Sequence, residues 1–228
     1  MKRILYCLMI LLTAACTQEK KQLSSWKTIE VGEYQFDVPP SFEFISEDGI
    51  DSDVGKLSGD GITFRFDFGY YSNTIVQSAE EFLQDDRWEI NAAVLNHHSQ
   101  ELLLPDVQAI RPAKSSDSSF SKGCDFIASC TVNGKSFDYP IALPAEIRAH
   151  RIISDTTGIV YSKIIAANVP GKGSTGIYLK RLNSYNNSIN SYLALSLSAE
   201  NLTFKQQQLA LKILKTWRLN PAKTGRRK

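Results

Sequence analysis

The sequence predicts an α+β fold, with helices packed on an antiparallel β-sheet in a single domain spanning residues 26–220. Runs of alternating apolar and polar residues recur along the chain, and Ile62–Phe68 is the clearest. Asn133-Gly134 separates two such runs and is a strong short signal for a β-hairpin. Capping boxes that open at Ser78 and Thr203 mark the start of two helices. Strand runs with few helices between them favour antiparallel sheets over alternating βα units.

The N-terminal part of the domain predicts three strands. Lys27–Val31 and Tyr34–Val38 both alternate, and Gly32-Glu33 between them can turn. In Ile62–Phe68 the isoleucine and three phenylalanines share one face, as in a sheet covered on one side. The intervening stretch Glu47–Gly61 is rich in acids and glycines but lacks the ligand spacing of a calcium loop. We therefore expect a solvated acidic loop there.

The middle of the chain predicts one helix and three strands. The capping box at Ser78 opens a helix that we expect to run to about Leu95. Val107–Ile110 favours a strand. Cys124–Val132 and Lys135–Leu143 are the two strands that the Asn-Gly turn joins.

The C-terminal part predicts three more strands and a long helix. The strands are Ile159–Ala166, Gly176–Leu182 and Tyr192–Ser198. Thr203 caps a helix predicted over Phe204–Leu219. A broad apolar face of this helix is expected to pack on the sheet, and it holds Leu209, Ala210, Ile213, Leu214 and Trp217.

An apolar segment at the N-terminus has the order of a secretory signal peptide, predicted to be residues 1–15. Two basic residues precede the apolar run Ile4–Leu12, which is too short to span a bilayer, and small residues follow it. The polar residues 16–25 then predict a flexible tether. The basic residues 221–228 are expected to be a disordered tail.

Leu12–Cys16 resembles the lipobox of bacterial lipoproteins, although Thr13 stands where that pattern prefers leucine. The resemblance implies cleavage between Ala15 and Cys16, a diacylglycerol on the Cys16 sulfur and an acylated amino end, so the expected partner is a membrane. Thr17 is not the aspartate that commonly marks inner-membrane retention, which implies the outer membrane, with the domain facing the periplasm or the cell exterior. The alternative is a secreted protein whose signal ends near Cys16.

Charge excludes one class of partner. The chain carries a formal net charge of +2, and loss of residues 1–15 removes Lys2 and Arg3, leaving 24 basic and 24 acidic side chains. This balance lacks the basic footprint of a nucleic-acid-binding protein, so no nucleic acid is expected. The roughly two hundred remaining residues suit one domain, or one domain with a large insertion.

Cys124 and Cys130 are the thiols left after Cys7 departs with the signal peptide and Cys16 is lipidated. An exported protein can oxidise such a pair to a disulfide. However, both fall on one face of a predicted strand, where six residues span about 20 Å, beyond the reach of a disulfide. We expect two core thiols unless the chain folds back between them.

Histidine offers little for catalysis, because His97, His98 and His150 are the only three. Adjacent histidines rarely share one metal, and no zinc-protease spacing is present. The sequence also lacks a serine-nucleophile elbow and a dinucleotide fingerprint, and residues 166–174 fail the P-loop spacing. We therefore expect no catalytic residue, metal site, cofactor or bound nucleotide.

A second resemblance concerns the soluble domain. The spacing W-x-x-I-x-x-G-x-Y-x-F-x-V-P at Trp26–Pro39 and the final strand and helix, ending Ile213–Leu219, resemble PsbP-like proteins. The resemblance implies an α/β/α sandwich and an accessory or partner-binding role, with a protein of the cell envelope as the partner.

The leading interpretation is a lipid-anchored cell-envelope protein with a non-catalytic binding or accessory role. The alternative is a lipid-anchored envelope hydrolase with an unrecognised carboxylate or histidine site. A histidine converging with acids in a deep pocket would favour the hydrolase. A shallow aromatic groove would favour binding, and its candidate residues are Tyr70-Tyr71, Tyr185 and Tyr192.

Overall fold

The computed structural model describes residues 25–84, 88, 104–117 and 123–224. Antiparallel β-sheets with a few helices make up this structure, which confirms that part of the predicted fold class. The chain forms two compact units, the first from Met1–Ile75 with Ile152–Lys228 and the second from Val76–Arg151. The second unit is thus inserted into the first. The predicted signal peptide, Ala15, Cys16 and most of the tether lie outside the described residues.

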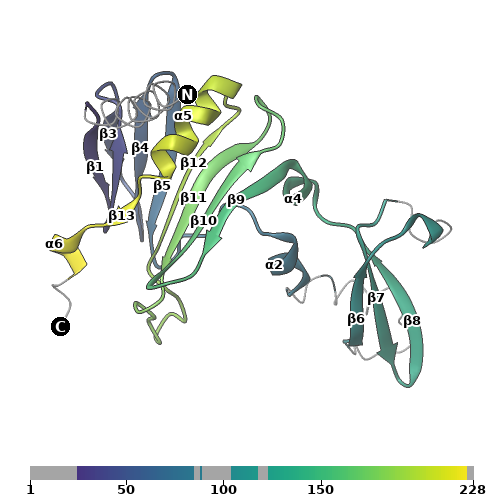
Figure 1. The fold of residues 1–228 in the computed structure, drawn as a ribbon. Helices are drawn as coiled ribbons and strands as arrows, with labels where there is room; N and C mark the ends of the chain where they lie inside the picture. Colours follow the sequence, from purple (N-terminus) through teal and green to yellow (C-terminus); the bar gives the residue numbers. More distant parts are fainter. Residues whose placement is uncertain (1–24, 85–87, 89–103, 118–122, 225–228) are drawn as a thin grey trace, which may run out of the picture. The chain divides into compact units, whose positions relative to one another are not determined.

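A seven-stranded sheet forms the centre of the first unit (Figure 1). Its order is β3-β4-β5-β12-β11-β10-β9, and every pair from β3 to β10 is antiparallel. The predicted strands in this unit are confirmed, although the last one begins at Ala194 and not at Tyr192. The strands are β3 (Glu43–Glu47), β4 (Asp53–Gly59), β5 (Ile62–Gly69), β9 (His150–Thr156), β10 (Val160–Ala167), β11 (Ser174–Arg181) and β12 (Ala194–Glu200).

One face of this sheet, called the inner face here, builds the main hydrophobic core. In β5 the predicted alternation is confirmed, because Thr63 and Arg65 are exposed while the apolar residues between and beside them are buried. The inner-face residues of β11 and β12 that neighbour them across the sheet are wholly buried, among them Ile177, Leu179, Leu195 and Leu197. Burial of such surface contributes about 25 cal/mol per Å².

A smaller antiparallel sheet belongs to the same core and contains β1 (Lys27–Val31), β2 (Tyr34–Val38) and β13 (Arg218–Leu219). The predicted hairpin β1–β2 is confirmed, and Tyr34 and Phe36 are wholly buried. Its turn requires glycine at position 32, because φ is +58° and a Cβ would lie 2.5 Å from the Phe68 ring. Beside the turn, the buried Glu33 accepts a hydrogen bond from Arg181 of β11.

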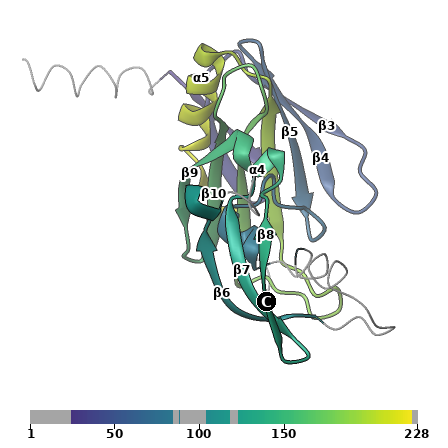
Figure 2. The same ribbon diagram turned by 90° about the vertical axis from the view of Figure 1, so that its right-hand side faces the viewer.

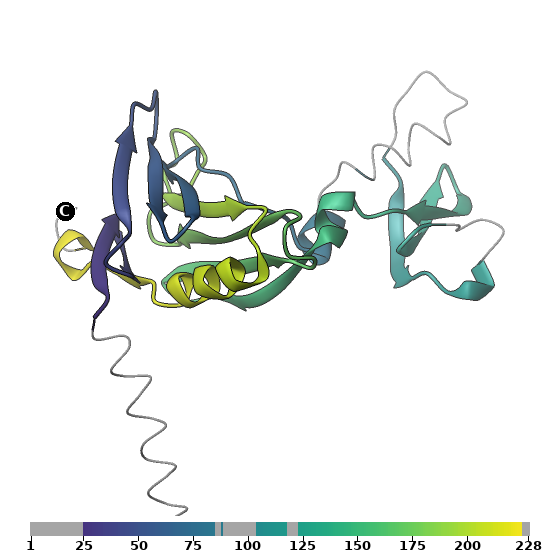
Figure 3. The same cartoon turned by 90° about the horizontal axis from the view of Figure 1, so that it is seen from above.

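Helix α5 (Phe204–Leu214) packs on the seven-stranded sheet, as Figure 3 shows. Its predicted capping box is confirmed, since Thr203 and Gln206 exchange side-chain and backbone bonds. Gln207 is a polar residue that the apolar pattern did not select, yet it is buried. Its Nε2 donates to the carbonyl oxygen of Ala167 at 3.0 Å and to Thr175 Oγ1 at 3.3 Å.

The prediction that this helix continues to Leu219 is wrong. It ends at Leu214, and Arg218 and Leu219 instead pair with β2 as strand β13. The Arg218 guanidinium donates two hydrogen bonds to the Asp37 carboxylate, at 2.8 and 2.9 Å. This bidentate pair lowers the pKa of Asp37 and fixes the strand on the hairpin. Trp217 fits the helical spacing in the sequence but lies beyond the end of α5. Its ring packs on Tyr34, and the two ring centroids are 6.3 Å apart.

The prediction of an acidic loop over Glu47–Gly61 is also wrong. Asp53–Gly59 of this stretch form β4, which pairs with β3 in a hairpin at the edge of the sheet (Figure 2). Gly55 is needed for close packing, because a Cβ there would lie 2.2 Å from the Ile45 carbonyl oxygen and 2.8 Å from the Phe66 ring. The glycines that suggested a loop thus include one that a buried aromatic ring requires.

The second unit contains a three-stranded antiparallel sheet in the order β6-β7-β8, built from β6 (Asp106–Pro112), β7 (Phe126–Val132) and β8 (Lys135–Ile141). Its predicted hairpin is confirmed, with φ of +51° at Asn133 and +75° at Gly134. The unit also holds α2 (Ala79–Leu83), η1 (Ser115–Asp117) and α4 (Ala145–Ala149). The Ser78 capping box is present, whereas the helix predicted beyond it to Leu95 lies mostly outside the described residues.

The C-terminal residues begin with a short helix, α6 (Pro221–Thr224), where the sequence predicted a disordered tail. Lys223 Nζ lies 3.3 Å from Glu30 Oε2 and donates to the Gly32 carbonyl oxygen at 3.0 Å. Residues 225–228 lie outside the described part of the chain. Within that part, no helix has the length and apolar character needed to cross a membrane.

The packing of α5 predicts that substitutions at two nearby positions lower the free energy of unfolding by very different amounts. Ile213 is wholly buried against the sheet, so Ile213→Ala should lower the free energy of unfolding by about 2–5 kcal/mol. The exposed Lys215, which caps the same helix, provides the control, and Lys215→Ala should change it by less than about 0.5 kcal/mol. Urea denaturation of residues 25–228 measures both, and equal midpoints for the two variants would contradict the packing.

The hydrogen bonds of Asp117, in the second unit, predict an unusually low pKa for its carboxyl group. It accepts two hydrogen bonds from Arg111, at 2.8 and 3.1 Å, and one from the Lys114 backbone N–H at 2.7 Å. These contacts, with Arg111 first, lower the pKa of Asp117 from 3.8 to about 2. Since the folded-state pKa is depressed, the stabilisation is present above the unfolded value and is lost as pH falls towards 2.

An NMR pH titration of the aspartate carboxyl carbons checks this value. Asp117 should remain ionised at about pH 3 in the wild type, and Arg111→Ala should move its midpoint back towards the ordinary range. A wild-type midpoint near the ordinary aspartate value would show that the ion pair does not persist in solution.

Candidate ligand-binding site

Two of the tyrosines predicted to line a groove lie together in the first unit. The Tyr185 and Tyr192 ring centroids are 4.8 Å apart, with the rings tilted by 52°. Tyr70 contacts the same loop through its backbone, since its carbonyl oxygen accepts a hydrogen bond from the Ser191 hydroxyl. Tyr71 is exposed, and no ring contact joins it to the pair in the described residues.

Lys180 and Tyr161, which sequence reasoning did not select, complete this cluster. They face each other directly across β10 and β11, on the face of the sheet opposite the inner face. The Lys180 Nζ lies 5.4 Å from the Tyr161 ring centroid and 5.4 Å from that of Tyr192. Both separations fall in the range of cation–π attraction. We call Tyr161, Lys180, Tyr185 and Tyr192 the tyrosine–lysine patch.

The electrostatic setting of Lys180 distinguishes it from the other basic residues nearby. Arg181, the next residue, is bound to Glu33 on the inner face. Lys180 forms no ion pair with any carboxylate among the residues that the structure describes. Its Nζ lies instead near tyrosine rings, whose faces carry a weak negative potential, and the amine keeps donors for an anionic group. The Asp155 carboxylate contacts the patch through the Tyr161 hydroxyl, at 3.4 Å, and not through Lys180.

The loop that carries Tyr185, residues 182–193, is held by its own hydrogen bonds. Asn186 and Ser191 exchange two backbone bonds, at 2.8 and 3.3 Å. The Tyr185 hydroxyl donates to Asn190 Oδ1, and the Ser184 hydroxyl accepts from the Leu193 N–H at 2.9 Å. The loop lies after β11 at the lower end of the sheet in Figure 1. These bonds position Tyr185 beside Tyr192 without a ligand.

A second lysine on the same face is closed to solvent. Lys163 is wholly buried and pairs across the strands with Tyr178, whose ring centroid lies 6.4 Å from that of Tyr161. Tyr178 pairs on its other side with Ser196, and Ser196 with Asp67. The patch thus adjoins a polar row that is buried at Lys163 and Tyr178 and half-buried at Ser196 and Asp67, whereas Lys180 is partly exposed.

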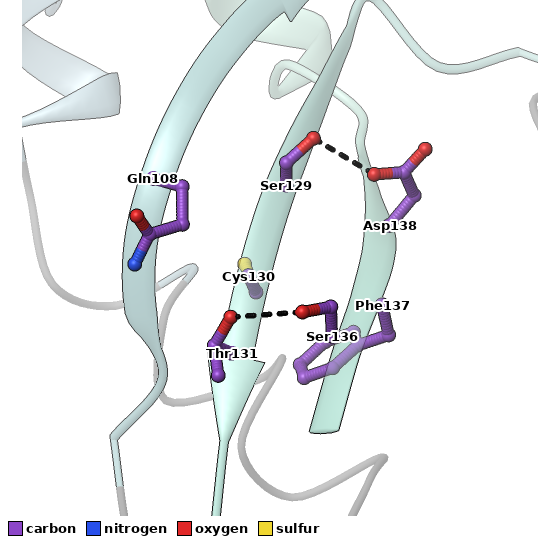
Figure 4. Close-up of a pocket in the computed structure, with 7 residues that line it drawn as sticks. All are labelled: Gln108, Ser129, Cys130, Thr131, Ser136, Phe137 and Asp138. Atoms are coloured by element: carbon purple, nitrogen blue, oxygen red, sulfur yellow. Dashed lines mark hydrogen bonds between the residues drawn. The ribbon is translucent and has the colours of Figure 1, made fainter. Parts of the chain in front are cut away.

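The second unit has a surface hollow of about 360 Å³ over its three-stranded sheet, lined by both polar and apolar side chains (Figure 4). Its hydroxyl groups bond to neighbouring strands, because Ser129 Oγ donates to Asp138 Oδ1 at 2.8 Å and Thr131 Oγ1 lies 3.2 Å from Ser136 Oγ. Gln108 on β6 donates to Asp106 at 2.7 Å. These groups already satisfy one another, so the hollow offers fewer unmatched donors than the patch.

The residues considered for catalysis are not brought together. His97 and His98 lie outside the described residues. His150 is the C-cap residue of α4, and its Nδ1 lies 2.6 Å from the Glu146 backbone carbonyl oxygen of that helix. In the described ranges, no three His, Cys, Asp or Glu side chains are placed to hold a metal ion.

Cys124 and Cys130 are both free thiols in the structure. Cys130 is buried in the small core of the second unit, with Ala128 and Ile141. Cys124 precedes β7 and is only partly buried, so the predicted common strand face applies to Cys130 alone.

No protein-family model matches the chain, and no curated protein sequence matches it either.

The two thiols should react at different rates. In a version spanning residues 25–228, Cys124 should react with a disulfide reagent in native buffer, whereas Cys130 should need unfolding because it is 1% exposed. Thiol titration before and after urea gives both values, with Cys130→Ala as the control. Absence of free thiols in unfolded monomer, with an intramolecular crosslink in its mass spectrum, would contradict this prediction.

Proposed function

We propose that the protein is a lipid-anchored protein of the bacterial cell envelope with a non-catalytic binding or accessory role. The basic, apolar and small residues that end at Cys16 support the anchor. Thr17 supports sorting to the outer membrane, with the folded domain in the periplasm or at the cell surface. A triacylated N-terminus holds a protein firmly, since each buried methylene contributes about 0.8 kcal/mol.

The tyrosine–lysine patch supports the binding role, and one observation carries it. The Lys180 Nζ lies 5.4 Å from the ring centroids of both Tyr161 and Tyr192 and forms no ion pair with a carboxylate of the described residues. Amphipathic aromatic side chains around a few polar groups are typical of recognition surfaces. The bonded loop positions these groups in advance, which reduces the entropy lost on binding.

Membership of the PsbP-like α/β/α sandwich proteins is the finer part of this proposal. The hairpin β1–β2 and helix α5, which cover the inner face together, lie at the two sequence positions on which the resemblance rests. A partner protein in the envelope would then be the ligand class typical of an accessory subunit. The patch is the surface that we assign to ligand recognition.

The anchor predicts a specific acylation. Cells grown with an alkyne-bearing fatty acid should label the wild-type protein strongly and Cys16→Ser at background, because the Cys16 thiol accepts the diacylglycerol. Cys124→Ser is the matched control and should label like the wild type, since Cys124 lies in the folded domain. Equal labelling of Cys16→Ser and wild type would remove the anchor from the proposal.

A further inference from the structure

The amide of Asn190, beside Tyr185 in the tyrosine–lysine patch, adds a third kind of binding group. Its Oδ1 accepts a hydrogen bond from the Tyr185 hydroxyl, and its side chain is exposed. Its Nδ2 group makes no hydrogen bond within the described residues. The amide is therefore fixed by its oxygen and keeps two N–H donors for a ligand.

The aromatic geometry restricts what can lie on the patch. Tyr185 is 46% exposed and its ring is tilted by 52° against Tyr192. Two rings at this angle do not form the parallel slot that a flat nucleobase fills by stacking. The electron-rich face of a tyrosine does attract weakly positive C–H groups, which line the faces of a pyranose ring.

The positive charge of the patch favours sugars that carry a carboxylate. Lys180 supplies a positive charge and forms no ion pair with a carboxylate of the described residues. A carboxylate on the ligand would add charge-assisted hydrogen bonds to this amine, and these are stronger than neutral ones. The amide donors of Asn190 match ring hydroxyl oxygens, which accept hydrogen bonds.

We propose that the tyrosine–lysine patch binds an acidic saccharide. A sugar ring lies on Tyr185 and Tyr192, its carboxylate binds Lys180, and the Asn190 amide binds a hydroxyl group. This inference rests on the proposed binding role and names its ligand class. It does not depend on the lipid anchor.

Calorimetric titration of the full-length protein in detergent tests the ligand class directly. The probes are a galacturonic acid tetrasaccharide, the galactose tetrasaccharide that lacks the carboxylates, and a tetra-aspartate peptide with the same number of side-chain charges. The acidic saccharide should bind at least tenfold more tightly than either of the others. Equal affinity for tetra-aspartate would show simple charge attraction, and equal affinity for the neutral saccharide would exclude a role for the carboxylate. Either result overturns the proposal.

Variants assign the binding to the patch. Lys180→Ala should weaken binding of the acidic saccharide about tenfold or more and leave the weaker neutral binding unchanged, while Lys180→Arg should retain most affinity. Tyr185→Ala should weaken both saccharides. The controls are Lys172→Ala, at the opposite end of β11, and Phe204→Ala, an exposed ring on α5; both should bind like the wild type.

Failure of this inference is distinguishable from failure of the proposed function. Each variant is first compared with the wild type by urea denaturation, so that a folding defect is recognised. Lack of binding by folded, fatty-acid-labelled wild type overturns the acidic-saccharide proposal and leaves the anchor supported. Binding that persists in Lys180→Ala places the ligand elsewhere and overturns the assignment to the patch.

Discussion

The structure of the first unit depends on covering the inner face of its seven-stranded sheet. Strands β5, β12, β11 and β10 present adjoining apolar side chains that water would otherwise solvate at a cost of about 25 cal/mol per Å². The hairpin β1–β2 and helix α5 cover this face from opposite ends of the sequence. Strand β13 joins these two covers, and Arg218 on Asp37 holds it in register. The opposite face around Lys180 is not part of this core, so polar and aromatic groups can occupy it.

Local signals in the sequence predicted most elements, and long-range packing explains where they failed. The Asn133-Gly134 turn and the capping boxes at Ser78 and Thr203 act within a few residues, so their outcome is visible in the sequence. The end of α5 was mispredicted because Arg218 and Leu219 pair with β2, about 180 positions earlier. Gly55 was interpreted as a loop residue because its packing partner is not visible within its own segment. The Phe66 ring that requires a glycine there lies on the next strand.

The sequence suggested two tyrosines of the candidate site but not the lysine and the third tyrosine that complete it. Tyr185 and Tyr192 were visible as aromatic residues near one turn, and the loop bonds that join them are local. Lys180 and Tyr161 meet only through the register of β10 and β11, which alternation within either strand cannot specify. The proposed lipidation of Cys16 is the reverse case, since it rests on the sequence alone and Cys16 lies outside the described residues.

The pairing of β5 with β12 has a consequence for how the molecule folds. Phe66 pairs with Leu197, so the centre of the main sheet joins segments separated by the whole inserted unit. A contact with this sequence separation raises the contact order, and loop closure must precede the stabilisation it brings. The second unit needs only its own continuous segment and can form first. During synthesis, the inserted unit can therefore complete its fold before the first unit, whose core closes only after β12 and α5 have been made.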